Sequence, residues 1–550
     1  MDYNLLAEKL FPHIHKTPED ILAQYPARDL PEGAKVTRMG PSPTGFMHLG
    51  NLYGALVDER LAHQSGGVFY LRIEDTDKKR EVEGGVLTII DAFSAFGLPF
   101  DEGATLTGDK GAYGPYRQSQ RAEIYQTFVK SLVQRGMAYP CFATEQELAE
   151  MREKQEAAKE NFGYYGKYAV WRDRPMEDIE AELAKGTPYV VRFRSEGSIE
   201  HKIRHDDLVK GKMEVTENDQ DVVILKSDGI PTYHFAHVVD DHLMGTTVVV
   251  RGEEWLATLP VHLQLFRAMG WKAPKYAHTA QLMKIDEQTG SKRKLSKRKD
   301  PELALTYYNQ QGYPAPSVLE YLMTLLNSNF EEWRRANPDK PMSDFPFSTK
   351  KMSGSGALFD IDKLKDVSKN VISRMPAEAV YDAVAAWSEK NDPAFHALFT
   401  REPDKTRAFL AIGRGGKKPR KDIALWSDVK PYMDFLFDEL FQPDYTLPEH
   451  VSKDDAKAIL QEFKAQFDEN DTPDGFFAKM KAIAVEHGFA AETKAYKQDP
   501  SQYKGHVGDV SMVVRIAVAG RQNAPDMQSV MHIMGKEQVQ ARLEQCIAAL

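Results

Sequence analysis

The sequence predicts an α/β protein with an inserted domain and an all-α C-terminal region, and three observations lead to this fold class. Residues 35–73 alternate strand, helix and strand. The alternation resumes near residue 219, after a stretch of different character. From about residue 376 the apolar residues show helical spacing and no strand pattern. With 550 residues, the chain is long enough for three or four domains.

The composition is that of a globular protein. Apolar residues make up 42% and charged residues 28%, which excludes disordered, collagen-like and coiled-coil chains. No apolar run approaches the roughly 18 residues of a membrane span, and the N-terminal residues lack the pattern of a secretory signal. Two cysteines, Cys141 and Cys546, are too few for a disulfide framework, so we expect a cytoplasmic protein without membrane contact. The net charge of −10 does not exclude a nucleic-acid partner, because such binding depends on local basic clusters.

The first α/β unit follows a predicted helical extension, residues 1–34. Residues 35–39 form a short strand, and a Gly/Pro-rich loop at 40–45 follows it. Apolar residues between 49 and 61 recur at helical spacing. Residues 68–73 are a continuous apolar run, which is typical of a buried parallel strand. Together these elements have the size of a βαβ crossover.

Residues 119–218 interrupt this pattern and are predicted to form the inserted domain. A helix is expected at 119–134, and residues 144–147 have the capping-box pattern at the start of a charged helix. Residues 188–194 alternate like a strand. The region therefore has its own helices and strand between two parts of one α/β domain.

After the insert the pattern predicts a strand at 221–225, a helix at 234–243, a strand at 246–250 and a helix at 255–269. From about residue 376 onward, the C-terminal region is predicted to be helical. Its clearest apolar stripes lie at 527–534 and 539–550, and they are interpreted as helix core.

Two segments carry candidate chemistry. The loop of residues 40–50 ends at a helix N-terminus, where backbone N–H groups favour an anion such as phosphate. In it, His48 adds a donor and Gly50 lets a flat base or ribose approach. Six of the eight residues 292–299 are basic, and their charges can neutralise a triphosphate leaving group. Taken alone, a segment like the first is more often an ordinary turn, and one like the second is usually a solvated loop or a nonspecific polyanion patch. Their order and separation form the sharper pattern.

Together the two segments resemble the motifs of class I aminoacyl-tRNA synthetases of the bacterial glutamyl-tRNA synthetase type. His48-Leu-Gly-Asn51 is similar to the family's His-Ile-Gly-His motif, and Lys294-Leu-Ser-Lys-Arg298 to its Lys-Met-Ser-Lys-Ser motif. Residues 72–77, 231–242 and 251–255 also match closely. The resemblance covers residues 35–370, and the C-terminal helices more loosely. Residues 1–34 have no recognised counterpart.

The resemblance implies a domain order. It assigns a Rossmann-like catalytic domain to residues 35–118 and 219–285, and an acceptor-end-binding domain to the insert at 119–218. Residues 286–375 become a stem-contact domain that carries the Lys294-Leu-Ser-Lys-Arg298 loop, and residues 376–550 a helical anticodon-binding domain.

The resemblance also implies an activity, the ATP-dependent attachment of L-glutamate to the 3′-terminal adenosine of tRNA(Glu) through glutamyl-adenylate. ATP enters with Mg²⁺. Such chemistry relies on positioning and charge stabilisation, so no protein nucleophile is needed. Whether tRNA(Gln) is a second acceptor stays open, and a monomer is expected.

The site residues follow from the same resemblance. The catalytic residues are expected to be His48, Lys294, Ser296 and Lys297; the ATP-binding residues Pro41, Gly45, His48, Gly50, Asn51, Glu254 and Lys297; and the glutamate-binding residues Arg38, Ser42, Glu74, Tyr233, His237 and Arg251. A carboxylate side chain needs a cationic fork, and Arg38 and Arg251 are the matching arginines. An amide would leave that fork half satisfied. Glu74 matches the acid that faces the ammonium group. His237 departs from the family, where a shorter amide is common, and each arginine could instead form a surface ion pair.

We expect no zinc, because Cys141 stands alone in the insert, where some relatives hold zinc with several Cys and His ligands. Residues 401–421 carry eight basic side chains, interpreted either as solvated surface or as contacts with the tRNA backbone. The alternatives are a nondiscriminating enzyme and, from another class, a non-catalytic tRNA-binding paralogue, which would be expected to have lost His48 or Lys297. The glutaminyl enzyme is disfavoured because its loop reads Pro-Pro-Glu-Pro, and the truncated tRNA-modifying relative because it lacks an anticodon-binding part.

Overall fold

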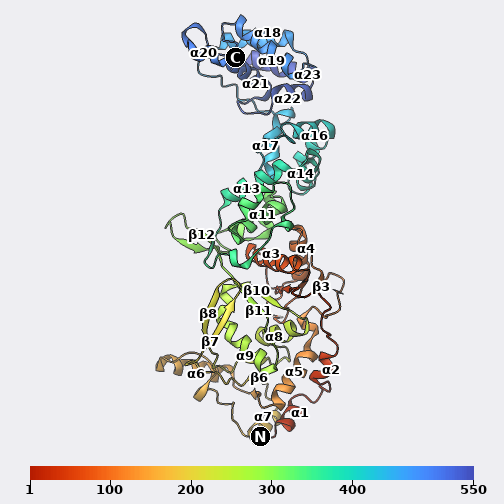
Figure 1. Ribbon diagram of the computed structural model, residues 1–550, viewed down its shortest axis with the longest axis vertical. Helices are drawn as coiled ribbons and strands as arrows, with labels where there is room; N and C mark the ends of the chain where they lie inside the picture. The colour runs from red at the N-terminus through yellow and green to blue at the C-terminus, as the bar shows by residue number, and fades with distance from the viewer. Residues whose placement is uncertain (78) are drawn as a thin grey trace. The chain divides into compact units, whose positions relative to one another are not determined.

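The computed structural model describes residues 1–77 and 79–550, shown in Figure 1. It forms two compact units. The first comprises Met1–Tyr307 and Leu319–Asp360, and the second comprises Tyr308–Val318 and Ile361–Leu550. Within residues 1–77 and 79–550, no helix combines the length and the apolar character needed to cross a membrane.

A parallel sheet forms the centre of the first unit. Its strands are β1 (Val36–Met39), β2 (Val68–Leu71), β3 (Glu102–Ala104) and the short antiparallel β4 (Asp109–Lys110), in the order β1-β2-β3-β4. A second parallel pair consists of β10 (Val248–Gly252) and β11 (Lys275–Thr279). It joins β1 where the N–H of Thr247 donates to the carbonyl oxygen of Val36 at 2.9 Å. The carboxyl ends of β1 and β10 therefore share one edge, the usual ligand edge of an open parallel sheet.

Helices pack on these strands as the periodicity predicts. The helix α3 (Leu49–Gln64) contacts β1, β2 and β10 through residues that are almost all buried. The other helices of this part are α4 (Gly85–Ala95), α8 (Tyr233–Leu243) and α9 (Leu259–Met269). The predicted strand at 246–250 lies two residues further on, at β10, because Thr247 makes the connection to β1. The predicted helix at 255–269 begins as a 3₁₀ segment, Glu253–Thr258, and only then becomes α9.

The inserted region contains α5 (Ala122–Gln134), α6 (Glu145–Ala158), α7 (Met176–Ala184), β5 (Ala138–Cys141) and β6 (Val190–Phe193). Thr144 caps α6 through the predicted capping box. A hairpin of β7 (Lys202–Asp207) and β8 (Gly211–Thr216) follows. The next strand, β9 (Val223–Leu225), pairs antiparallel with β6. The strand predicted at 221–225 is thus present, but it extends the sheet of the insert and not the parallel sheet, so the boundary at residue 219 stays a prediction.

The N-terminal extension contains α1 (Tyr3–Leu10) and α2 (Pro18–Leu22), and both pack on α5. Leu6, Leu10 and Phe11 are buried there in one apolar cluster with residues of α5. A small sheet, ordered β13-β12-β14, consists of β12 (Leu282–Ile285), β13 (Lys292–Lys294) and β14 (Ala357–Leu358). Three helices lie between β13 and β14 in the chain, namely α10 (Leu305–Gln311), α11 (Ala315–Leu326) and α12 (Phe330–Ala336).

From Ile361 to the C-terminus the described chain contains helices and no strand, which confirms the predicted helical region. Its helices are α13 (Ile361–Arg374), α14 (Ala377–Asn391), α15 (Pro393–Phe399), α16 (Pro403–Ala411), α17 (Val429–Met433), α18 (Lys453–Gln466), α19 (Pro473–Glu486), α20 (Thr493–Gln498), α21 (Val507–Ala519), α22 (Met527–Met534) and α23 (Lys536–Ala549). The two C-terminal stripes are buried in one core, including Met531 and Leu543.

Candidate active site

A cavity of about 460 Å³ lies at the carboxyl ends of β1 and β10. Its walls come from β1, the start of α3, the start of α8, β10 and the segment after β12. The sequence-predicted residues that line it are Arg38, His48, Gly50, Asn51, Glu74, Tyr233, Arg251, Glu254, Lys294 and Lys297. The fold thus brings ten of the fifteen predicted residues to one cavity.

The other five predicted residues, Pro41, Ser42, Gly45, His237 and Ser296, are not among its lining residues. Ser42 is exposed to solvent. The carbonyl oxygen of Pro41 accepts the N–H of Glu74 at 3.0 Å, and the N–H of Ser296 donates to Asp300 Oδ2 at 2.8 Å. Pro41 and Ser296 therefore fix the backbone of neighbouring lining residues.

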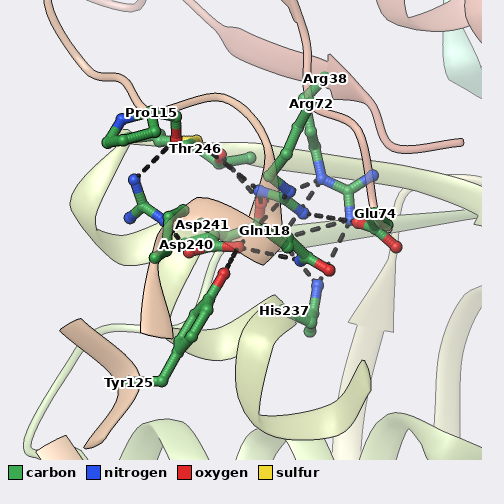
Figure 2. A network of polar contacts seen from close by, with 12 residues as sticks. Arg38, Arg72, Glu74, Pro115, Gln118, Tyr125, His237, Asp240, Asp241 and Thr246 are labelled. Carbon is green, nitrogen blue, oxygen red and sulfur yellow. Dashed lines mark hydrogen bonds and ion pairs between the residues drawn. The ribbon is translucent and has the colours of Figure 1, made fainter. Parts of the chain in front are cut away.

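A buried ion-pair network supports the cavity at Arg38 (Figure 2). Arg38 Nε donates to Asp241 Oδ1 at 3.0 Å, and Arg72 Nη1 donates to the same oxygen at 2.7 Å. Burial would raise the pKa of Asp241, but the charges of Arg38 and Arg72 outweigh it and hold that pKa well below its usual range. Asp241 is thus ionised and fixes both guanidinium groups.

A second carboxylate extends the network toward the insert and the N-terminal extension. Asp240 accepts from Arg121 Nε at 2.8 Å, from Gln118 Nε2 at 2.9 Å and from the Tyr125 hydroxyl at 2.8 Å. Arg121 Nη1 also donates to the hydroxyl oxygen of Tyr25 at 3.0 Å. Tyr25, in the loop after α2, is in this way connected to the ion-pair network, since Asp240 also lies 3.8 Å from Arg72 Nε.

Glu74 stands at the end of this network and at the cavity wall. Its Oε1 accepts from Arg72 Nη2 at 2.9 Å. A Cβ on Gly40 would lie 2.5 Å from that oxygen, so only glycine leaves space for the carboxylate. Burial raises the pKa of Glu74, and the charges of Arg72 and Arg38 oppose the rise. A ligand cation at this position would favour the ionised form.

His237, predicted to bind glutamate, lies behind Arg38. Its side chain is fully buried, its Nδ1 is 2.8 Å from Asp241 Oδ2, and its Nε2 is 3.0 Å from the Tyr276 hydroxyl. Burial lowers its pKa to about 4, so the ring is neutral. Because both ring nitrogens are engaged, the imidazole supports Arg38 and presents no free atom to the cavity.

Arg251 is held differently from Arg38. Its Nε donates to His278 Nε2 at 2.9 Å, and its Nη1 is 2.9 Å from His262 Nδ1. Burial lowers the pKa of both histidines. Nη2 of Arg251 is buried and has no hydrogen-bond partner among the described residues. A buried donor without a partner is costly, so this atom calls for an acceptor from a ligand.

Two aromatic rings, those of Tyr233 and Trp255, also line the cavity. Tyr233 is the first residue of α8, and its ring centroid lies 4.7 Å from that of Trp255, which is 39% exposed. Burial raises the pKa of Tyr233, which keeps its hydroxyl protonated. The pair forms an apolar wall with one hydroxyl donor.

The other side of the cavity is the start of α3. The N–H of His48 donates to Asn51 Oδ1 at 3.0 Å, which closes the first turn of the helix. A Cβ on Gly50 would lie 3.1 Å from His48 Nδ1, so the glycine leaves room for the imidazole. That nitrogen is buried without a partner in the described chain, and burial followed by the charge of Lys297 lowers the pKa of His48.

The basic segment is anchored by residues that do not face the cavity. Arg293 donates to both carboxylate oxygens of Asp300, at 2.6 and 2.8 Å, and this lowers the pKa of Asp300 to about 2. Lys297 makes no ion pair within the described residues; its Nζ lies 4.6 Å from the centre of the Phe46 ring. The anchor fixes the ends of the segment and leaves the charge of Lys297 available.

Sequence reasoning missed several residues of the site. Arg72, Asp240 and Asp241 lie in motifs that match the family, but the sequence does not reveal that they form one network. Asp58 also lines the cavity; its Oδ1 is buried without a partner in the described chain, and burial raises its pKa well above the usual range. An acidic residue on the buried face of an apolar helix was the available signal.

The basic stretch of the second unit is partly neutralised. Arg401 pairs with Glu439 at 2.5 Å, and Arg407 pairs with Glu378 at 2.9 Å. Lys417, Lys418 and Lys421 are exposed. These three lysines are therefore exposed cations that form no ion pair among the described residues.

Metal ligands do not gather in the described part of the chain: residues 1–77 and 79–550 contain no group of three or more His, Cys, Asp or Glu side chains that could hold an ion. Cys141 is buried, and its Sγ lies 3.4 Å from the Tyr164 hydroxyl. The expected absence of zinc stays a prediction.

Comparison with known proteins gives matches over the whole chain. The family described as "tRNA synthetases class I (E and Q), catalytic domain" matches residues 35–366, and the one described as "Anticodon binding domain" matches residues 418–547. Glutamate–tRNA ligases of Acetivibrio thermocellus and Clostridium perfringens are 54% and 49% identical, over 100% of both chains in each pair. A solved glutamate tRNA ligase from Elizabethkingia meningosepticum, in complex with its amino acid, aligns with a TM-score of 0.73 and 26% identity over 94% of this chain and 99% of that one. The fold class predicted above is thereby confirmed.

Proposed function

Because the chain belongs to the class I tRNA synthetases of the glutamate and glutamine group, we propose a division of labour among the residues of its cavity. The reaction is ATP-dependent ligation of L-glutamate to tRNA. An oxygen of the glutamate α-carboxylate attacks the α-phosphorus of ATP, and pyrophosphate leaves. A ribose hydroxyl of the terminal adenosine then attacks the carbonyl carbon, and AMP leaves. The observation that carries the choice of amino acid is the unpartnered, buried Nη2 of Arg251.

Arg251 and Arg38 receive the side-chain carboxylate of glutamate. Nη2 of Arg251 is the free donor, and Nη1 of Arg38 donates no hydrogen bond within the described chain. A carboxylate accepts from both guanidinium groups, whereas an amide offers one acceptor and two donors. The amide of glutamine would place N–H groups against N–H groups, which is the basis for rejecting it.

Glu74 receives the ammonium group of glutamate. Arg72 fixes one carboxylate oxygen at 2.9 Å, which leaves the remaining lone pairs for the substrate. The opposite charge of the ammonium group favours the ionised form of Glu74 and offsets the effect of burial. The substrate is thereby held at both ends, with its α-carboxylate free to react.

The start of α3 and the basic segment receive ATP together with its Mg²⁺. A neutral His48 can donate one hydrogen bond to a phosphate oxygen, and Gly50, Asn51 and Glu254 line the same cavity. Lys294 and Lys297 stabilise the negative charge that grows on the leaving pyrophosphate.

For the tRNA, we assign the acceptor end to the inserted region and the backbone of the anticodon arm to the exposed lysines Lys417, Lys418 and Lys421. Phosphate contacts of this kind supply much of the affinity for a nucleic acid. We further propose a monomer that works in the cytoplasm, with tRNA(Glu) as the acceptor.

Two assays test this function. Pyrophosphate exchange with glutamate, ATP and tRNA present should be active, and no exchange would favour the non-catalytic paralogue. Charging of separate tRNA(Glu) and tRNA(Gln) transcripts tests which tRNA is the acceptor. Equal charging of both would contradict tRNA(Glu) as the sole acceptor and favour the nondiscriminating enzyme.

A further inference from the structure

The arginine proposed to read glutamate is the end of a hydrogen-bonded chain that begins in the inserted region. Arg251 Nε donates to His278 Nε2 at 2.9 Å. On the other side of the ring, His278 Nδ1 lies 2.6 Å from Oδ2 of Asp207, the last residue of β7. The side chains of Asp207 and His278 are fully buried, and Arg251 is 8% exposed. Each of the three residues comes from a different strand.

The carboxylate of Asp207 is fixed by the turn of the hairpin. Its Oδ1 accepts the N–H groups of Val209 and Lys210, both at 2.9 Å, and the N–H of His278 at 3.2 Å. The N–H of Leu208 also donates to the carbonyl oxygen of Tyr276 at 2.9 Å. Oδ1 is therefore committed to backbone donors, and Oδ2 is the oxygen that faces the histidine ring.

These hydrogen bonds allow only one tautomer of His278. Nε2 accepts from a guanidinium N–H, so it carries no proton. The single proton of the neutral ring is then on Nδ1, where it is donated to Asp207. A carboxylate that holds an imidazole in one tautomer through Nδ1 is the arrangement by which proteins orient catalytic and ligand-binding histidines.

We propose that Asp207 and His278 are positioning residues that aim Arg251 at the side-chain carboxylate of glutamate. The inference rests on the proposed role of Arg251 and deepens it. With Nε held by His278 and Nη1 close to His262, the plane of the guanidinium is set and Nη2 is left for the ligand. A residue of the inserted hairpin thus takes part in the choice of amino acid, although it touches no substrate.

The substitution Asp207→Asn tests this without changing the shape of the side chain. The amide oxygen must take the place of Oδ1, because three backbone N–H groups point there. The amide nitrogen then faces His278 Nδ1 with a donor, which moves the ring proton to Nε2 and sets it against the Nε–H of Arg251. The KM for glutamate should rise by about 10- to 100-fold, the scale found when a metal-binding histidine loses the partner that orients it. The kcat and the KM for ATP should change less than about three-fold, since the lost contact is made equally in the ground and transition states.

Asp206→Asn is the matched control, because it removes the same charge one residue earlier from an exposed side chain. Asp206→Asn should leave the KM for glutamate and the KM for ATP unchanged. The thermal unfolding midpoints of both variants should be compared, to separate a loss of stability from a loss of glutamate binding. The full-length enzyme is used, in pyrophosphate exchange with tRNA present.

A double-mutant cycle separates positioning from structural damage. In the Arg251→Gln background, Asp207→Asn should have little further effect on the glutamate KM, because there is no guanidinium left to aim. If the two effects multiply, or if Asp207→Asn leaves the glutamate KM within two-fold of wild type, the inference is overturned. If Arg251→Gln alone leaves the glutamate KM unchanged, it is the proposed role of Arg251 that fails.

Discussion

Replacing Arg251 with glutamine should weaken the preference of the enzyme for glutamate. The guanidinium is buried, its Nη2 has no partner among the described residues, and both of its neighbours are neutral histidines. No carboxylate among the described residues forms an ion pair with it, so its charge is available to the ligand. Removing one partner of a buried, hydrogen-bonded charge pair costs about 2–5 kcal/mol. At about 1.4 kcal/mol per factor of ten, kcat/KM for glutamate should fall by about 30- to 4,000-fold.

Glutamine should lose less, because its amide never paired with the charge. The loss of one neutral hydrogen bond is about 1 kcal/mol. The net difference of about 1–4 kcal/mol means that the ratio of kcat/KM for glutamate to that for glutamine should shrink by about 5- to 700-fold, while the KM for ATP stays almost constant.

The assay is tRNA charging with each amino acid by the wild type and by Arg251→Gln. Arg204→Gln is the control, since it removes the same charge from a side chain that is 92% exposed. If the variant still prefers glutamate by the wild-type margin, Arg251 does not read the side-chain carboxylate.

The remaining predictions concern ATP, metal and stability. Lys297→Ala should lower the activation rate by about 10²-fold or more with little change in the KM for glutamate. Lys292→Ala, which changes a lysine of the same segment outside the cavity, is the control and should leave the rate unchanged. An activation rate of Lys297→Ala within a few-fold of wild type would remove Lys297 from the mechanism. Elemental analysis should find well under one zinc per chain, and a stoichiometric zinc that survives dialysis against a chelator would contradict this. Asp241→Asn should lower the free energy of unfolding at pH 7 by about 3–5 kcal/mol, because two buried guanidinium groups lose their carboxylate. Because the pKa of Asp241 is depressed in the folded state, its contribution is present above about pH 4 and is lost as the pH falls, so the variant should show a weaker loss of stability on acidification than wild type.

The sequence predicted single helices and strands well, because the patterns that indicate them lie within a few adjacent residues. The strand at 35–39 and the helix from Leu49 were confirmed, because alternation and helical spacing are properties of adjacent residues. The pairing of β9 was not predictable in the same way. Its apolar run shows that a strand exists, but its neighbour β6 lies about thirty residues earlier and is chosen by packing.

The site shows the same division. His48, Lys294 and Lys297 belong to short motifs, and the fold places all three at the cavity. His237 also lies in a matching segment, yet its ring contacts Asp241 and Tyr276 and does not line the cavity. Its position in α8 directs the side chain away from the cavity, and a motif match does not reveal this direction. The partners Asp207 and His278 are 71 residues apart, and no pattern in the sequence connects them.

The two arginines that the sequence treats as equal members of a fork differ in their charge environment. Arg38 lies 3.0 Å from Asp241, so much of its charge is already balanced inside the protein. The neighbours of Arg251 are uncharged: the imidazoles of His278 and His262 and the ring of Tyr276, 4.9 Å away. Asp207 is separated from it by the ring of His278. Discrimination between a carboxylate and an amide depends on an unbalanced cation, because a cation already paired with an acid attracts both ligands weakly. We therefore propose that Arg251 senses the charge of the substrate and that Arg38 fixes its direction.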